Sequence, residues 1–165
     1  MKEITCCFTG HRPAKLPWGY EERGAQFRAF LKKLERAIID AIERGYTHFI
    51  SGGAMGFDMI SAEMVLKLKK KYKNITLECA LPCFNQTNRW NEAQVARYEK
   101  ILEQADCVNY VSKRYYFNGC MAVRNAYMLE CSSLVIACVV DEKSGAGGTL
   151  LKAQKMGLEI VNIGV

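Results

Sequence analysis

Two glycine-rich stretches have the composition of an anion-binding site. The first, "SGGAMGFD" at residues 51–58, follows a run of β-branched and aromatic residues, and the second, "SGAGGT" at residues 144–149, follows an apolar run. Each leads into a helical pattern, and the start of a helix attracts phosphate or carboxylate through free backbone N–H groups and the helix dipole. The residues that we expect to contact such a ligand here are Ser51, Gly52, Gly53, Gly56, Gly147, Gly148 and Thr149.

The first stretch matches neither of the familiar phosphate-loop patterns. No Gly-Lys-Ser/Thr follows it, as a Walker loop requires, and Gly52 and Gly53 are adjacent, which breaks the spacing of Gly-x-Gly-x-x-Gly. Alone, it is equally typical of a tight turn between a strand and a helix. Two such stretches in one small protein, with a further glycine near the N-terminus, are hard to explain as turns and favour a phosphate-bearing ligand.

The N-terminal segment "TGHRP", residues 9–13, also has the residue types of a ligand-binding loop. Gly10 permits a close approach of the backbone, and Arg12 offers a planar guanidinium that suits phosphate or carboxylate. His11 can act as an acid, a base or a hydrogen-bond donor, or it can be a loop histidine without a role. We expect Thr9, Gly10, His11 and Arg12 to line the site.

Two carboxylates follow the first glycine-rich stretch. Asp58 falls in the first turn of the expected helix, where the helix dipole stabilises a negative charge whether or not a ligand binds. Glu63 comes five residues later, about 140° around the helix, so the two carboxylates do not form an obvious acid–base pair. If the protein is an enzyme, Asp58 and Glu63 are the candidate acid–base residues.

Polar and aromatic residues follow another expected strand in "LPCFNQTNRW", residues 81–90. Pro82 ends the strand, and Asn85, Gln86 and Trp90 have side chains that can contact a base or sugar, or alternatively cap the next helix. Further on, "SKRYYFNG" at residues 112–119 suits a lid, a subunit contact or core packing. We place Pro82, Gln86 and Trp90 among the ligand-binding residues.

Strand patterns and helix patterns alternate along the whole chain, which predicts parallel βαβ units and a three-layer α/β fold. The expected Rossmann-like domain comprises residues 1–165, with a mostly parallel sheet of about six or seven strands and helices on both faces. Ligands of such sheets bind at the carboxyl ends of the strands, where all the segments above lie. The expected helices are 21–44, 55–71, 91–104, 119–130 and 148–156, and the expected strands are 3–10, 46–51, 74–82, 107–112, 133–140 and 158–163.

Composition is ordinary for a globular protein, with a net charge of +6 and eight cysteines among 165 residues. The cysteines lack any Cys-x-x-Cys spacing, and neither His11 nor His48 is grouped with them, so we expect no metal. The positive charge is compatible with an anionic ligand but has no basic, aromatic-interleaved stretch for nucleic acid. No apolar run is long enough for a membrane span and "MKEITCCF" is unlike a signal peptide, so we expect a cytoplasmic protein without a membrane partner.

In their order along the chain, these segments resemble the YpsA-like family of the SLOG superfamily, which also includes DprA (Smf) and the LOG phosphoribohydrolases. The resemblance rests on "FTGHRP", "SGGAMGFDMISAE", "LPCFNQTNRW", "MAVRNAYM" and "GAGGT", and it extends over nearly the whole chain. It implies a Rossmann-like fold that binds a nucleotide or a nucleotide-derived ligand, such as one related to ADP-ribose, at the glycine-rich edge. It also implies a homo-oligomer.

The comparison with LOG enzymes implies further site residues and an alternative activity. LOG enzymes carry Met-x-x-Arg-Lys on one helix and Pro-Gly-Gly-x-Gly-Thr-x-Glu-Glu after the next strand, and the arginine and a glutamate act in N-glycosidic cleavage. Here Met121 and Arg124 match the first pattern, with Asn125 in place of the lysine. Leu151 and Lys152 replace the two glutamates of the second pattern. The resemblance therefore adds Arg124 and Asn125 to the ligand-binding residues, with Arg124 catalytic only in an enzyme.

Three functions follow from these observations, in order of preference. The first is a sensor or regulatory protein that binds a nucleotide without turnover and needs no other cofactor. The alternative is a nucleotide N-glycosidase or phosphohydrolase that uses Asp58, Glu63 and Arg124. Single-stranded DNA binding, as in DprA, is third, and we expect a nucleic-acid partner least.

Overall fold

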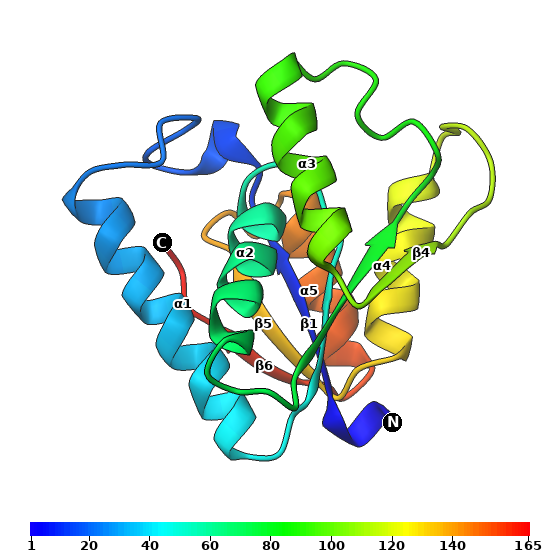
Figure 1. Ribbon diagram of the computed structural model, residues 1–165. Coiled ribbons are helices and arrows are strands. Elements are labelled where there is room, and N and C mark those ends of the chain that lie inside the picture. The colour runs from blue at the N-terminus through cyan, green and yellow to red at the C-terminus, as the bar shows by residue number, and fades with distance from the viewer.

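A parallel sheet of six strands forms the centre of the computed structural model, which describes residues 1–165 (Figure 1). The strand order is β4-β3-β2-β1-β5-β6, and every neighbouring pair is parallel. The predicted three-layer α/β fold is therefore confirmed, with six strands. The strands are β1 (Thr5–Gly10), β2 (His48–Ser51), β3 (Thr76–Leu81), β4 (Cys107–Tyr110), β5 (Leu134–Cys138) and β6 (Glu159–Asn162).

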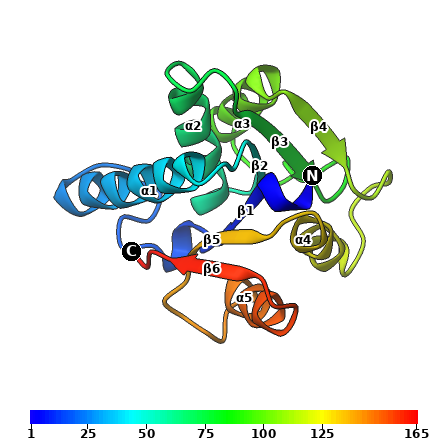
Figure 2. The ribbon, with the colours of Figure 1, turned by 90° about the horizontal axis from the view of Figure 1, so that it is seen from below.

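Five α-helices cover the two faces of the sheet. Viewed from below, α1, α2 and α3 lie on one face and α4 and α5 on the other (Figure 2). Because each parallel crossover is right-handed, helices change face where the chain turns back across the sheet between β4 and β5. The helices are α1 (Ala25–Glu43), α2 (Phe57–Lys69), α3 (Glu92–Gln104), α4 (Cys120–Glu130) and α5 (Gly145–Lys155), with short 3-10 helices at Lys2–Ile4 and Pro13–Lys15.

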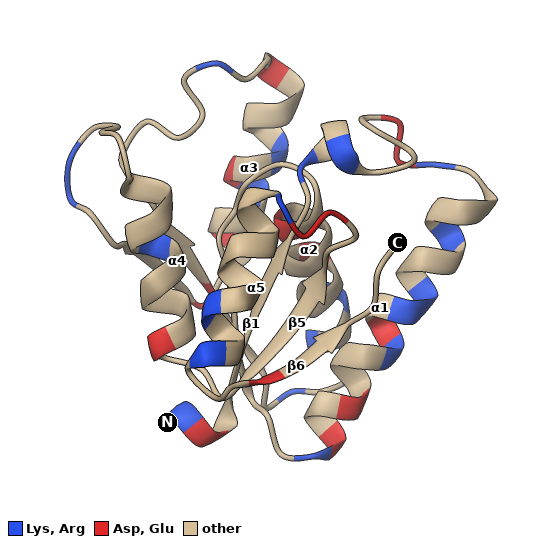
Figure 3. Cartoon of the chain, turned by 180° about the vertical axis from the view of Figure 1, so that it is seen from behind, with Lys and Arg blue, Asp and Glu red and all other residues tan.

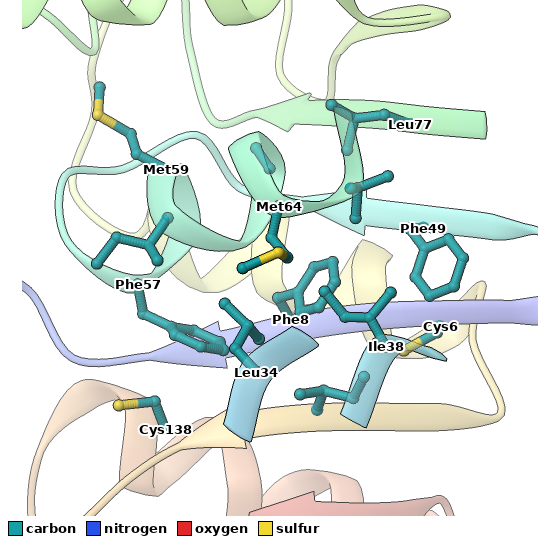
Figure 4. Packing of buried hydrophobic residues seen from close by; sticks show 14 of the residues in the cluster. Cys6, Phe8, Leu34, Ile38, Phe49, Phe57, Met59, Met64, Leu77 and Cys138 are labelled. Carbon is teal, nitrogen blue, oxygen red and sulfur yellow. The ribbon is translucent and has the colours of Figure 1, made fainter. Parts of the chain in front are cut away.

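Successive side chains of the central strands point to opposite faces of the sheet and pack into two separate hydrophobic cores. In β1, Cys6 and Phe8 pack with α1 and α2, whereas Cys7 packs on the opposite face with α4. Figure 4 shows Phe8 beside Leu34 of α1 and Phe57 of α2. Each fully buried side chain of this size stabilises the fold by about 1.5–3 kcal/mol. The carboxyl end of β1 is thus held rigidly between two packed layers.

Three helices begin two or more residues away from the start that the sequence predicts, and the other two begin one residue later than predicted. The helix expected from residue 21 begins at Ala25, and the one expected from residue 55 begins at Phe57, because Gly24 and Gly56 have φ values of 98° and 90° and cannot be helical. The helix expected from residue 148 begins three residues earlier, because the side chain of Ser144 caps it. For α3, the expected start is confirmed by a capping box between Asn91 and Gln94.

The order of the strands reverses at β1 and β5. From β1 the chain proceeds outward through β2, β3 and β4, and it then returns to place β5 on the other side of β1. In open α/β sheets, ligands bind beyond the carboxyl ends of the strands at such a point. A ligand-binding site is therefore expected at the segments after β1 and β5. None of the helices has the length and hydropathy required of a membrane span.

Candidate functional site

A cavity of about 330 Å³ lies at the carboxyl ends of β1 and β5. It is bounded by the loop after β1, the first turn of α2, one face of α4 and the start of α5. Its volume falls at the lower end of the range for small-molecule sites. The residues expected in the site that line this cavity are Thr9, Gly10, His11, Arg12, Asp58, Arg124 and Asn125.

Arg124, on α4, is the most fully anchored of these residues. Its side chain is buried, and Nη1 donates hydrogen bonds to the carbonyl oxygens of Gly52 at 2.5 Å and Ala80 at 3.2 Å. Nε donates to Oδ1 of Asn125 at 2.8 Å. Burial lowers the pKa of Arg124, and the nearby carboxylate of Asp58 opposes that shift. The protein thus fixes a guanidinium in the wall of the cavity.

Gly52 makes room for this arrangement. A Cβ atom at position 52 would lie 2.5 Å from Nη1 of Arg124 and 2.7 Å from Oδ2 of Asp58. Carbon atoms do not approach anchored polar groups so closely without displacing them. The first glycine of "SGGAMGFD" is therefore explained by contacts within the protein, not by contact with a phosphate.

Gly10 and Gly56 hold the loop after β1 against the start of α2. A Cβ at Gly10 would lie 2.5 Å from the ring of Phe57, and one at Gly56 would lie 2.6 Å from the carbonyl oxygen of His11. The backbone N–H of Phe57 donates to that same oxygen at 3.1 Å. These two glycines thus allow the segments 9–13 and 51–58 to interlock.

Asp58 occupies the first turn of α2 and makes this helix start unfavourable for a second anion. Its Oδ2 accepts a hydrogen bond from the N–H of Ala54 at 3.3 Å, and its carboxylate is buried. Burial raises the pKa of Asp58, while the positive charges of Arg124 and Arg12 act to lower it. Because this carboxylate already lies at the positive end of the helix dipole, it repels another negative group.

His11 is held in one tautomer by the backbone after β5. Its Nε2 atom accepts hydrogen bonds from the N–H groups of Val140 at 2.9 Å and Asp141 at 3.2 Å, so its proton is on Nδ1. Burial, followed by the charge of Lys15, lowers the pKa of His11 and favours this neutral form. The Nδ1 atom is buried and has no partner in the protein. His11 therefore keeps one hydrogen-bond donor unused.

The start of α5 has unused donors as well. Ser144 uses its side chain to accept from the N–H of Gly147 at 3.0 Å, and its carbonyl accepts from Gly148 at 3.0 Å. The N–H groups of Gly145 and Ala146 donate no hydrogen bond within the chain. The amides free for an anion are thus two residues earlier than the glycines that the sequence indicated, and both residues line the cavity.

Two further basic residues stand at the mouth of the cavity. Lys15 forms an ion pair with Asp141 at 2.6 Å, so its charge is compensated. Arg12 is exposed and forms no ion pair; its Nη2 contacts only Sδ of Met121, at 3.8 Å. In Figure 3, the acidic segment after β5 lies beside basic segments that follow β1. The negative charge of Asp58 offsets the positive charge of Arg124. The charge of Arg12 has no such counterpart, so the cavity is positive overall.

Some of the expected residues lie elsewhere. Glu63, on α2, accepts hydrogen bonds from Arg97 of α3, the shortest at 2.6 Å, and does not line the cavity. Gln86 donates to the hydroxyl of Tyr98 at 3.2 Å, and Trp90 packs edge-on against the same ring. The residues that the structure leaves out of the cavity wall are Ser51, Gly52, Gly53, Gly56, Glu63, Pro82, Gln86, Trp90, Gly147, Gly148 and Thr149.

The sequence prediction also omitted residues that do line the cavity. Lys15 lies in the 3-10 helix after β1, one helical turn beyond Arg12, and Met121 lies one turn before Arg124 on α4. Ser144 stands three residues before Gly147, the spacing of a helix N-cap, and this signal would have placed the start of α5 correctly. The omitted lining residues with polar groups toward the site are Lys15, Ser144, Gly145 and Ala146.

Among solved structures, the fold is similar to that of DNA processing protein A. The chain aligns with the Streptococcus pneumoniae protein at a TM-score of 0.64 and 16% identity, covering 96% of this chain and 50% of that one. With the Helicobacter pylori protein, whose structure describes a mode of single-stranded DNA binding, the TM-score is 0.61 at 21% identity, with 96% and 64% covered. The chain thus spans about half to two thirds of these longer proteins, and the likeness concerns the fold.

Sequence comparison finds relatives of similar length. The UPF0398 protein BH1768 of Halalkalibacterium halodurans is 31% identical over 157 residues, covering 94% of this chain and 81% of its own. A UPF0398 protein of Bacillus cereus is 28% identical over 155 residues, covering 93% and 84%. The family model YpsA, described as the YspA SLOG family, matches residues 6–159. The chain therefore belongs to the YpsA family of SLOG proteins.

Proposed function

We propose that this protein binds a nucleotide by its phosphate group at the start of α5 and acts as a sensor or regulatory protein. The observation that carries the proposal is the set of unused donors around one positive cavity. Gly145 and Ala146 offer free backbone N–H groups, His11 offers an unpartnered Nδ1–H, and Arg12 offers an uncompensated charge. A phosphate accepts several hydrogen bonds and carries negative charge, so it suits a positive cavity with free donors.

The anchored arginine supports the same ligand. The Nη1 and Nε atoms of Arg124 donate hydrogen bonds within the protein, while its Nη2 atom donates only to the sulfur of Met121, at 3.7 Å. That nitrogen is a weakly satisfied donor in the cavity wall. A ligand oxygen can therefore bind to Arg124 without disrupting the contacts that hold α4 to the sheet.

A nucleotide N-glycosidase is the second candidate, because Asp58 places a buried carboxylate with a raised pKa in the same cavity. Such a group can protonate a leaving base or stabilise a positive sugar. Glycoside hydrolysis generally uses two carboxylates, however, and Glu63 is paired with Arg97 away from the cavity. Binding without cleavage is therefore the better-supported function.

The first experiment separates binding from cleavage and from binding of nucleic acid. The purified protein is titrated with nucleoside 5′-monophosphates, NAD and ADP-ribose by calorimetry, and released base is measured by chromatography. Binding without base release is expected. Base release that disappears in Asp58→Asn supports the glycosidase instead. Salt-sensitive binding of an oligothymidylate with no mononucleotide binding supports a DNA-binding function like that of the Helicobacter protein.

A matched pair of variants tests the position of the phosphate. Arg12→Gln removes the uncompensated charge, and we expect its mononucleotide affinity to fall about tenfold, the effect of one charge-assisted hydrogen bond. Arg23→Gln is the control, because Arg23 is exposed and pairs only with Glu21. Equal affinities of the two variants and the wild type would rule out phosphate binding at this cavity.

A further inference from the structure

A second hollow adjoins the phosphate cavity and runs between α4 and α5. Its volume is about 480 Å³, and it shares Met121, Asn125 and Gly145 with the first cavity. Lys152 and Tyr116 also line it. Because the first cavity is small for a whole nucleotide, a ligand bound by its phosphate at α5 has this direction in which to extend. The inference below therefore rests on the proposed function.

Two positions on one face of α5 carry no side chain along this hollow. Gly145, Gly148 and Lys152 lie at helical spacings of three and four residues, so they share a face and are successive turns apart. A Cβ at Gly145 or Gly148 would meet no protein atom within 4 Å. No contact inside the protein accounts for these glycines, although glycine within a helix is less stable than alanine by about 0.5–1 kcal/mol.

Lys152 supplies an uncompensated positive charge at the end of that face. It is exposed, and its ammonium group forms neither a hydrogen bond nor an ion pair. It lies seven residues beyond Gly145, which is about 10 Å along the helix axis. The Lys152 side chain points back toward the start of α5, as helical side chains do, and it favours an anion on the ligand other than the phosphate at Gly145.

The wall opposite α5 has the surface that a nucleoside requires. Tyr116 is 59% exposed, and its ring offers a face for stacking. Its backbone N–H donates a hydrogen bond to Oδ1 of Asn85 at 2.7 Å. Asn118 brings an amide to the same hollow. The loop that carries the aromatic ring is thus fixed, and its polar and aromatic groups face the glycine side of α5.

We propose that the hollow between α4 and α5 is a second subsite, and that the ligand is a nucleotide with a second, separate phosphate group that binds Lys152. The ligand backbone lies across Gly145 and Gly148, where any side chain would obstruct it. The class of ligand is a nucleoside bisphosphate. The subsite accounts for the two open glycines and the unpaired lysine together.

The test compares nucleoside 5′-monophosphates with nucleoside 3′,5′-bisphosphates, for each of the four bases, by calorimetry. We expect the wild type to bind at least one bisphosphate about tenfold more tightly than its monophosphate. Lys152→Met should abolish this preference and leave the monophosphate affinity unchanged. Lys155→Met is the matched control, since Lys155 is exposed on the same helix but does not line the hollow.

A second variant tests the open face independently of charge. Gly148→Ala should unfold at higher urea concentration than the wild type, yet bind both ligands at least tenfold more weakly. Equal binding of monophosphate and bisphosphate by the wild type would overturn the second subsite, as would a bisphosphate preference that survives Lys152→Met. Absence of any monophosphate or bisphosphate binding would instead overturn the proposed function, so the two failures are distinguishable.

Discussion

Individual glycines in this protein have different physical roles, although they look alike in the sequence. Gly52 makes space for Arg124 and Asp58, and Gly10 and Gly56 allow two segments to interlock. Gly148 makes space for no part of the protein. Only the last kind leaves open space beside the helix, where the proposed ligand would lie. A glycine-rich pattern therefore locates the crowded edge of the sheet without saying which of its residues touch a ligand.

Gly52 should be the most sensitive of these positions. In Gly52→Ala, the added methyl group lies 2.5 Å from Nη1 of Arg124, which two carbonyl oxygens hold in place. We expect a loss of about 1–3 kcal/mol in the free energy of unfolding, measured by urea denaturation. The same measurement on Gly148→Ala should show a gain. Equal stability of Gly52→Ala and the wild type would show that Arg124 moves freely.

At the scale of elements, the two helix N-termini at the site are used in opposite ways. The start of α2 is occupied by the carboxylate of Asp58, which accepts from Ala54. The start of α5 is capped by the neutral side chain of Ser144, which leaves the N–H groups of Gly145 and Ala146 free. A neutral cap preserves the attraction of the helix dipole for an external anion.

Exchanging the cap of α5 for a charged one should separate stability from binding. Aspartate caps helices as well as serine does, so Ser144→Asp should retain the urea stability of the wild type. Its carboxylate would lie beside the free amides, as Asp58 does at α2, and we expect nucleotide affinity to fall at least tenfold. Ser144→Ala serves as the opposite control, with about 1 kcal/mol lost in stability and no added charge. Unchanged binding by Ser144→Asp would show that the phosphate lies elsewhere.

At the scale of the whole molecule, the fold could be predicted from the sequence, but the composition of the site only partly. Alternating patterns and right-handed crossovers determine the three layers, and all the expected strand-end segments do meet at one edge. Sequence position does not say which strands are adjacent, however. Pro82, Gln86 and Trp90 follow β3, which lies two strands from β1, so they do not reach the cavity. Gln86 and Trp90 instead contact Tyr98 of α3.

The ion-pair partners of the charged side chains could not be predicted from the sequence either. Glu63 is close to Asp58 in the chain, yet Arg97 of α3 binds it on the other side of α2. Arg97 also binds Glu22 at 2.8 Å, and the two carboxylates raise the pKa of the Arg97 guanidinium against the effect of burial. Such a choice of partner depends on helix packing between distant segments, which no local pattern encodes.

The separation of the two helical layers leads to a prediction for hydrogen exchange across the whole chain. The proposed ligand contacts the loop after β1 and the layer of α4 and α5, whereas α1 and α3 lie on the other face (Figure 2). A saturating mononucleotide should therefore slow amide exchange at residues 9–15 and 144–152. It should leave amide exchange in β4 and on the exposed side of α1 unchanged, apart from the general stabilisation that any ligand of the folded state confers.

Mass spectrometry of peptides from the free and bound protein measures the change in exchange, with Arg12→Gln as the control that should lose the protection. Slower exchange concentrated in α1 and α3, which do not line the cavity, would place the ligand elsewhere and contradict the proposed site.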